Sequence, residues 1–328
     1  MTGAGRMAGA GQVTGAGVVT LGETMALMTA EQVGPLRHAR SLRLTIAGAE
    51  SNLAIGVRRL GVPAAWLGRV GDDEFGELIR GTVAGQRVVT SAIVDPDAPT
   101  GLMIKERRTG TRTRVRYYRS GSAGSRLAPA DLDHAPIADA QVLHVTGITP
   151  ALSPTARDTV FAAIELAREH HVPVSVDLNY RQALWAPDQA RAVFRDLAGR
   201  ADILLATEDE GRLVADAEEP ARLAADLAAL GPAEVLVKLG ERGAAAHIDG
   251  RPYPVPPRPV AVLDPVGAGD AFAAGYLASR CRGADAPARL DAAATTGAFA
   301  VTVAGDWEGA PTMAELDLLD GAGDAVSR

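Results

Sequence analysis

Short apolar runs alternate with longer amphipathic segments along the second half of the chain. The runs, at 142–146, 174–178, 203–206 and 235–239, are rich in Val, Leu and Ile and have the length of buried β-strands. The segments between them, at about 154–170, 188–199 and 219–230, carry apolar residues at helical spacing. Strands that alternate with helices in this way form parallel sheets with right-handed crossovers. The pattern therefore predicts an α/β fold.

The first half of the chain has a similar but less regular pattern. Strands are predicted at 18–21, 41–46 and 64–70, and a helix follows each of the last two. The run 41–46 alternates between apolar and polar residues, as a half-buried strand does. The final helices are predicted at about 269–283 and 289–304, on either side of an apolar cleft.

The composition changes between residues 88 and 119, where turn residues and charges replace the long apolar runs. Asp95–Pro99 predicts a turn, and Thr109–Gly110 predicts the tip of a hairpin. The arginines at alternate positions from Arg112 to Arg116 share one strand face, which is usually solvated. We expect a small β-sheet lid that excludes water from a site below it. The expected division is a disordered tail at 1–17, an α/β core at 18–30, 48–87 and 120–320, and a lid at 31–47 and 88–119.

Composition excludes several classes of protein. The 328 residues are 47% hydrophobic but only 4% aromatic, so the core must be built from Ala, Val and Leu. The net charge of −7 argues against nucleic acid or a membrane as a general partner. The single cysteine excludes an intramolecular disulfide. No apolar run is long enough to cross a bilayer, and the first 17 residues lack the apolar region of a secretory signal, so we expect a cytoplasmic protein.

Polar or glycine residues follow each of the four strands in the second half. They are Gly147, Asp177 to Arg181, Thr207 to Glu210, and Gly240 to Gly243. In open α/β sheets, ligands bind outside the carboxyl ends of the strands. Four polar strand ends at one edge of the sheet therefore predict a binding site.

A glycine-rich turn leads into the Ala-rich segment between Asp264 and Tyr276. The first amides of such a helix have no intrahelical partner and bind anions, phosphates above all. Asp270 stands among these amides, where a carboxylate would repel a resting phosphate. Two interpretations are open: Asp270 caps the helix, or it accepts the proton of a hydroxyl that attacks the bound phosphoryl group.

A second candidate site precedes the helix that contains Leu53. Gly48 lets a ligand approach the backbone, and Asn52 offers both a donor and an acceptor to a polyol. The alternative is an ordinary helix start in which Ser51 or Asn52 is the cap.

The residues from Asp264 to Phe272 resemble the second signature of the ribokinase-like (PfkB) sugar kinase family, D-x-x-G-A-G-D-x-F. The resemblance implies that Asp270 is the catalytic base. It also implies that Gly267, Ala268 and Gly269 form the anion hole for the transferred phosphoryl group. Gly48 and Asn52 fit the family's first signature, whose glycine and asparagine line the sugar pocket. The implied fold is ribokinase-like: a mostly parallel, Rossmann-like sheet flanked by helices, with a small β-sheet lid.

The same resemblance implies ATP and Mg²⁺ as cofactors and leaves open a monovalent cation. Glu210 stands at the glutamate of the family's N-x-x-E motif, which supports the water shell of magnesium, but Thr207 replaces the asparagine. Gly240 to Gly243 match the family's nucleotide loop. The residues expected to contact the nucleotide are Asn179, Arg181, Thr207, Lys238, Gly240, Arg242, Gly243, Gly267, Gly269 and Ala294.

Three stretches, at 117–125, 147–153 and 179–182, are more similar to the 2-keto-3-deoxygluconate kinase branch of the family than to ribokinase or fructokinase. The branch implies that Tyr117 and Arg119 hold an acid sugar and that Arg181 reaches the sugar or the phosphates. Ile148 is a further expected sugar contact. Met103 departs from the branch, which often has a tyrosine there.

The resemblance extends from about residue 18 to 311 and implies ATP-dependent phosphorylation of the terminal (carbon six) hydroxyl of 2-keto-3-deoxygluconate. Two alternatives stay open: a kinase for fructose, ribose, another keto-deoxy sugar acid or a nucleoside, and a sugar-binding regulator without catalysis. A dinucleotide-dependent oxidoreductase is disfavoured, because the first βαβ unit has no G-x-G-x-x-G. We expect a sugar acid and ATP as partners, no nucleic acid or membrane, and a homo-oligomer.

Overall fold

A computed structural model describes residues 15–109 and 113–320. Its larger sheet has nine strands in the order β13-β12-β11-β10-β9-β8-β1-β4-β5. The strands are β1 (Val18–Leu21), β4 (Ala64–Gly71), β5 (Val89–Asp95), β8 (Val142–Thr146), β9 (Val174–Asp177), β10 (Ile203–Thr207), β11 (Glu234–Lys238), β12 (Ala244–Ile248) and β13 (Arg251–Val255). All neighbouring strands from β5 to β11 in this order pair in parallel. At the other edge, β12 pairs antiparallel with both β11 and β13. The expected mostly parallel α/β sheet is confirmed.

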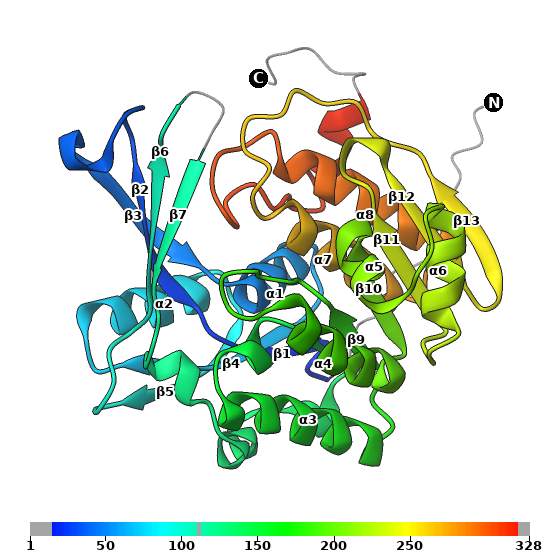
Figure 1. Ribbon diagram of the computed structural model, residues 1–328, viewed down its shortest axis with the longest axis horizontal. Helices are drawn as coiled ribbons and strands as arrows, with labels where there is room; N and C mark the ends of the chain where they lie inside the picture. The colour runs from blue at the N-terminus through cyan, green and yellow to red at the C-terminus, as the bar shows by residue number, and fades with distance from the viewer. Residues whose placement is uncertain (1–14, 110–112, 321–328) are drawn as a thin grey trace, which may run out of the picture.

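Helices cover both faces of this sheet (Figure 1). They are α1 (Ala49–Arg59), α2 (Glu74–Gly85), α3 (Pro154–Glu169), α4 (Pro187–Arg200), α5 (Glu208–Val214), α6 (Pro220–Ala228), α7 (Ala268–Cys281) and α8 (Ala286–Ala300). Apolar residues of α3 to α6 pack with one buried cluster, and those of α1, α2, α7 and α8 pack with another. The two clusters are the two layers expected of a sheet whose parallel strands are buried on both faces.

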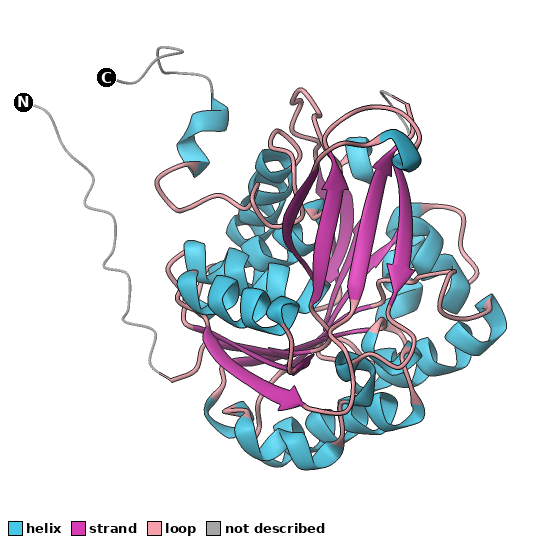
Figure 2. Ribbon diagram, turned by 90° about the vertical axis from the view of Figure 1, so that its left-hand side faces the viewer, coloured by secondary structure: helices cyan, strands magenta, loops and turns pink. Residues whose placement is uncertain are grey.

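A smaller sheet of four strands stands beside the larger one (Figures 1 and 2). Its order is β3-β2-β6-β7, with β2 (Met25–Ala30), β3 (Leu42–Ala47), β6 (Leu102–Arg107) and β7 (Thr113–Tyr118). A small apolar cluster, which includes Leu27, Met103 and Val115, lies on one face of this sheet. We call this sheet the lid.

Two of the predicted boundaries between lid and core are wrong. Residues 25–30 were assigned to the core, but β2 is a central strand of the lid and pairs with β3 and β6. Residues 88–95 were assigned to the lid, but β5 pairs with β4 at the edge of the larger sheet. Both errors concern the partner of a strand, which a local pattern does not specify.

Three further observations concern the loop before α7, the residues outside the described part and the lengths of the helices. An apolar run at 260–263, which precedes the glycine-rich turn, lies in a loop, where Val262 and Leu263 are 64% and 67% exposed. The predicted tail falls almost entirely on residues outside the described part, as do Arg112 and the hairpin residue Gly110. Within the described residues, no helix is long and apolar enough to span a membrane.

Candidate active site

The site lies where the strand order of the larger sheet reverses. From β1 the chain builds the sheet outward through β4 and β5, and it then returns to the other side of β1 as β8 and continues to β11. At such a reversal the connections leave on opposite faces and open a crevice at the carboxyl ends of the strands. Gly22 and Glu23 follow β1, and Gly147 and Ile148 follow β8, so both pairs lie at the edge of the sheet where the topology places such a crevice.

Gly267 shapes the turn that precedes α7. Its φ of 78° is left-handed, and a Cβ there would lie 1.9 Å from the carbonyl oxygen of Asp306. Glycine is therefore required for both conformation and space. The first intrahelical bond runs from the Ala271 amide to the Gly267 carbonyl, and no acceptor among the described residues takes the amides of Ala268, Gly269 or Asp270. These amides are therefore free at the positive end of the helix dipole, as the predicted anion site requires.

Asp270 lies in the first turn of α7 and contacts the other predicted sugar motif. The Asn52 side-chain amide donates a 2.9 Å hydrogen bond to Asp270 Oδ2. Burial raises the pKa of Asp270 to about 7, although the Asn52 hydrogen bond and the charges of Arg181 and Lys238 oppose the rise. A carboxylate poised near neutral pH is suited to act as a general base.

Asp177 and Lys238 form a buried ion pair below these amides. Lys238 Nζ lies 2.6 Å from Asp177 Oδ2, and the other oxygen, Oδ1, is buried without a hydrogen-bond partner. Burial alone would lower the pKa of Lys238, but the negative charges of Asp177 and Glu210 raise it. A Cβ on Gly269 would lie 3.4 Å from Lys238 Nζ, so this ammonium group reaches the anion site. The sequence predicts Asp177 only as a polar residue after a strand, because its pairing with Lys238 depends on the order of β9, β10 and β11 in the sheet.

Glu210 joins the ends of β9 and β10 through its carboxylate. Oε1 accepts from the amide of Tyr180 at 2.8 Å, and Oε2 accepts from the amide of Thr207 at 2.7 Å. Thr207 is the N-cap of α5 and is itself exposed. Asn179, in a left-handed conformation (φ 39°), turns the chain toward the exposed Arg181, whose charge acts on Asp270. The structure thus brings Arg181 and Lys238 together around Asp270, with Glu210 beside Lys238.

The guanidinium of Arg119, which is expected to bind the carboxylate of the sugar, already contacts a carboxylate of the protein. Its Nε donates to Glu23 Oε2 at 2.7 Å, its Nη2 contacts the same oxygen, and the guanidinium lies over the Tyr117 ring, 5.7 Å from its centroid. One edge of the fork is therefore occupied by Glu23, and only Nη1 has no partner among the described residues. Met103 is buried in the apolar cluster of the lid, so the departure from tyrosine replaces a polar group by an apolar contact.

A second buried carboxylate, Glu50, was not singled out from the sequence. Its Oε1 accepts hydrogen bonds from the hydroxyls of Thr146 and Thr149, at 2.7 and 2.8 Å, and these residues flank Ile148. Burial raises the pKa of Glu50, and the hydrogen bonds from both threonines and the charge of Arg119 only partly offset that rise. The sequence signal that could have identified Glu50 is its place as an acidic residue in the first turn of a helix.

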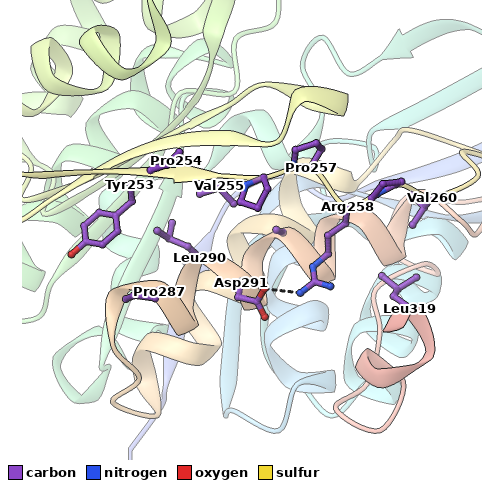
Figure 3. A pocket seen from close by; sticks show the side chains of 13 residues that line it. Tyr253, Pro254, Val255, Pro257, Arg258, Val260, Pro287, Leu290, Asp291 and Leu319 are labelled. Atoms are coloured by element: carbon purple, nitrogen blue, oxygen red, sulfur yellow. Dashed lines mark hydrogen bonds and ion pairs between the residues drawn. The ribbon is translucent and has the colours of Figure 1, made fainter. Parts of the chain in front are cut away.

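A cavity of about 590 Å³ lies between α8 and the segment that follows β13 (Figure 3). Its walls are mostly apolar and include Val255, Val260, Leu290 and the predicted nucleotide contact Ala294. Arg258 spans the cavity wall and forms a 2.6 Å ion pair with Asp291.

The predicted nucleotide loop, Gly240 to Gly243, packs against the end of β13 and the residues that follow it. Gly243 has a φ of 85°, and a Cβ there would lie 2.1 Å from the carbonyl oxygen of Val255, so only glycine allows this approach. Arg242 is exposed and forms an ion pair with Glu208, and Gly240 is exposed beside it.

Free amides at a helix N-terminus, with a carboxylate of raised pKa beside them, are suited to phosphoryl transfer to a small molecule, the chemistry of a kinase. The chain belongs to the PfkB family of carbohydrate kinases: the model of the "pfkB family carbohydrate kinase" matches residues 16–313. This membership confirms the resemblance found in the sequence.

Curated relatives cover nearly the whole chain. It is 37% identical over 305 residues to the 2-dehydro-3-deoxygluconokinase of Thermoproteus tenax, covering 91% of this chain and 92% of the relative. It is 35% identical over 308 residues to the 2-dehydro-3-deoxygluconokinase of Bacillus subtilis (90% and 93% covered). It is also 35% identical over 290 residues to the 2-dehydro-3-deoxygalactonokinase of Haloferax volcanii (88% and 91% covered).

Solved structures share the fold. A PfkB protein from Polaromonas sp. JS666 aligns with a TM-score of 0.83 at 36% identity, covering 92% of this chain and 99% of that one. A putative ribokinase II from E. coli, in complex with ATP and Mg²⁺, aligns with a TM-score of 0.85 at 27% identity (93% and 99% covered).

Proposed function

We propose that this carbohydrate kinase transfers the γ-phosphoryl group of ATP to the carbon-six hydroxyl of 2-keto-3-deoxygluconate, also called 2-dehydro-3-deoxygluconate. The observation that carries the chemistry is Asp270, which lies half-buried beside free amides and accepts a hydrogen bond from Asn52. The substrate is supported by the named activities of relatives at 35–37% identity.

Asp270 would accept the proton of the attacking hydroxyl as the oxygen–phosphorus bond forms. The amides of Gly267 to Asp270 and the ammonium of Lys238 would hold the negative charge that moves through the phosphoryl group, and Arg181 would neutralise the bridging region. The carboxylates of Asp177 and Glu210 are hard oxygen ligands of the kind that magnesium and its bound waters prefer. When bound with the nucleotide, Mg²⁺ supplies charge neutralisation on the phosphates.

The nucleobase would bind toward the cavity between α8 and the residues after β13. Its size suits a flat heteroaromatic ring with sugar attached, and its apolar walls suit a base. Ala294 lies in its wall, and the loop with Gly240, Arg242 and Gly243 packs against the same segment at Val255. The free amides of α7 follow a few residues after Val260, which lines the cavity. Base and phosphates would thus occupy adjacent parts of one cleft.

The acid sugar would bind under the lid, among Gly48, Asn52, Ile148 and the guanidinium of Arg119. Two sugar acids with different stereochemistry are the named substrates of the relatives, and the galactonate form is therefore the second candidate. An acceptor panel measured by ADP release separates them: 2-keto-3-deoxygluconate, 2-keto-3-deoxygalactonate, fructose and ribose, each with and without K⁺. A preference for a neutral sugar would overturn the assignment, and dependence on K⁺ would add a monovalent cation.

Replacing Arg119 by alanine is expected to raise the KM for the acid sugar by tenfold or more, because a charged hydrogen-bonding partner is lost. The matched acceptor is 3-deoxyglucosone, which carries an aldehyde where 2-keto-3-deoxygluconate carries its carboxylate. Steady-state kinetics on both acceptors test the role. An equal rise in KM for both would exclude Arg119 from carboxylate recognition.

The rate is expected to depend on pH through Asp270. A general base must be ionised, so kcat/KM should fall tenfold per unit below a pKa of about 7 and level off above it. Asn52→Ala removes a hydrogen bond that lowers this pKa, so its profile should move to higher pH. Profiles of kcat/KM from pH 5.5 to 9 measure both effects. A flat profile in this range would contradict the role of Asp270.

We further propose that the enzyme is a cytoplasmic homo-oligomer that pairs through the lid. The face of the lid opposite its apolar cluster carries Leu42, Leu44 and Tyr118, which are 39%, 47% and 59% exposed. Leu42 and Leu44 lie on the edge strand β3 and Tyr118 on the opposite edge strand β7, and exposed apolar residues on one face of a sheet are a common pairing surface. Leu44→Lys should lower the mass measured by light scattering after size exclusion. An unchanged mass, or a monomeric parent protein, would refute the pairing. The proposed compartment follows from the donor, because ATP is a cytoplasmic metabolite.

A further inference from the structure

The chain passes between the core and the lid four times. The passages run from β1 to β2, from β3 to α1, from β5 to β6, and from β7 to the short helix η2 (Ala123–Arg126). Any movement of the lid relative to the core would have to bend these four passages. Glu23 is the middle residue of the first one, and its side chain is almost completely buried (1% exposed).

Glu23 contacts all of the other passages. Its Oε2 accepts from Arg119, and its Oε1 accepts from the hydroxyl of Ser122, both in the passage after β7. A Cβ on Gly101, which leads into β6, would lie 2.6 Å from Glu23 Oε1. A Cβ on Gly48, which leads into α1, would lie 2.6 Å from the Glu23 carbonyl oxygen. The carboxylate of Glu23 therefore bonds the passage after β7 and packs closely against the passage before β6, and its backbone packs against the passage before α1.

The contact with Glu23 fixes how Arg119 faces the crevice. A guanidinium group is a rigid, planar fork, so an acceptor on its Nε edge sets the direction of the remaining N–H groups. Here Glu23 holds the Nε edge of the Arg119 guanidinium, and the ring of Tyr117 packs against one face of the guanidinium plane. This leaves Nη1 as the free end. The charge of Arg119 also acts on Glu50, another buried carboxylate, where it partly offsets the rise in pKa that burial causes.

We propose that Glu23 is a positioning residue for substrate selection: it holds the Nε edge of the Arg119 guanidinium and so aims Nη1 at the carboxylate of the sugar acid. This inference rests on the proposed function, because it needs an anionic acceptor. Glu23 contacts no reacting atom. Its effect should therefore appear in the binding of acid sugars and leave the phosphoryl transfer step intact.

The test is Glu23→Gln, which keeps the size of the side chain but removes its charge. The KM for 2-keto-3-deoxygluconate is expected to rise about tenfold, with kcat, the KM for ATP and the kinetics of 3-deoxyglucosone close to those of the parent protein. In an Arg119→Ala background the same substitution should have no further effect, because Glu23 acts through Arg119.

A matched control is Glu234→Gln. Glu234 is also a buried carboxylate, held by Tyr276, Arg280 and Arg289, and it lies at the amino end of β11, opposite the site. The Glu234→Gln substitution is expected to lower Tm without a selective change in the KM for the acid sugar. Where Glu23→Gln does not yield folded protein, Ser122→Ala removes one hydrogen bond from Glu23 Oε1 and should give a smaller rise in the same KM.

The possible outcomes separate the two proposals. A parent protein that phosphorylates only neutral sugars refutes the proposed function, and the role of Glu23 with it. A parent protein active on the acid sugar, with an unchanged KM in Glu23→Gln, refutes only the role of Glu23. An equal rise in the KM for the acid sugar and for 3-deoxyglucosone in Glu23→Gln would show that Glu23 is purely structural, and would also refute its role in substrate selection.

Discussion

Asp270→Asn is expected to lose about two to four orders of magnitude in kcat, the usual contribution of a positioned general base. The asparagine keeps the shape of the side chain and an oxygen that can accept the hydrogen bond from Asn52. The free amides at the start of α7 remain, so ATP should still bind. The measurement is ADP release with 2-keto-3-deoxygluconate, together with the Kd for ATP.

The stability of this variant gives a second check. Because burial raises the pKa of Asp270 to about 7, its ionised form opposes folding, and that cost is present at pH 8. Asp270→Asn should therefore have a Tm at pH 8 equal to or above that of the parent protein. Asp209→Asn, an exposed acid in the first turn of α5, is the matched control and should retain full activity. Turnover near the parent value in Asp270→Asn would end the assignment of the base.

Lys105→Met is expected to destabilise the protein by about 3–5 kcal/mol, the typical effect of leaving one member of a buried ion pair alone. Lys105 lies on β6 of the lid and pairs with Asp306, and their side chains are 5% and 7% exposed. Burial raises the pKa of Asp306, and the charge of Lys105 opposes that rise. Urea unfolding at pH 8 measures the loss.

Two comparison variants define this effect. The double variant Lys105→Met with Asp306→Asn removes both charges and should recover part of the stability. Arg80→Met removes an exposed ion pair with Glu77 and should cost less than about 1 kcal/mol. If Lys105→Met unfolds at the same urea concentration and with the same slope as the parent protein, the pair does not hold the lid to the core. Activity should fall with stability, because the Asp306 carbonyl lies directly behind Gly267.

Local patterns were sufficient for most elements of the larger sheet. The run at 142–146 is β8 residue for residue, and the predicted helix at about 154–170 is α3 within one residue. Both carry a strong hydrophobic period and clear end signals, Ser153 capping α3 among them. The short strands β12 and β13 were missed, because five-residue segments with alanine or proline carry little strand propensity.

The amino-acid sequence by itself determined the α/β class, the family and the glycine-dependent turn at Gly267, since each depends on residues close together in the chain. Only the tertiary structure decided which sheet β2 and β5 join and which groups oppose each other across the crevice. The pairs Glu23–Arg119 and Lys105–Asp306 join residues 96 and 201 positions apart. Contacts of that kind depend on strand order and burial, which a local pattern of apolar and polar residues does not encode.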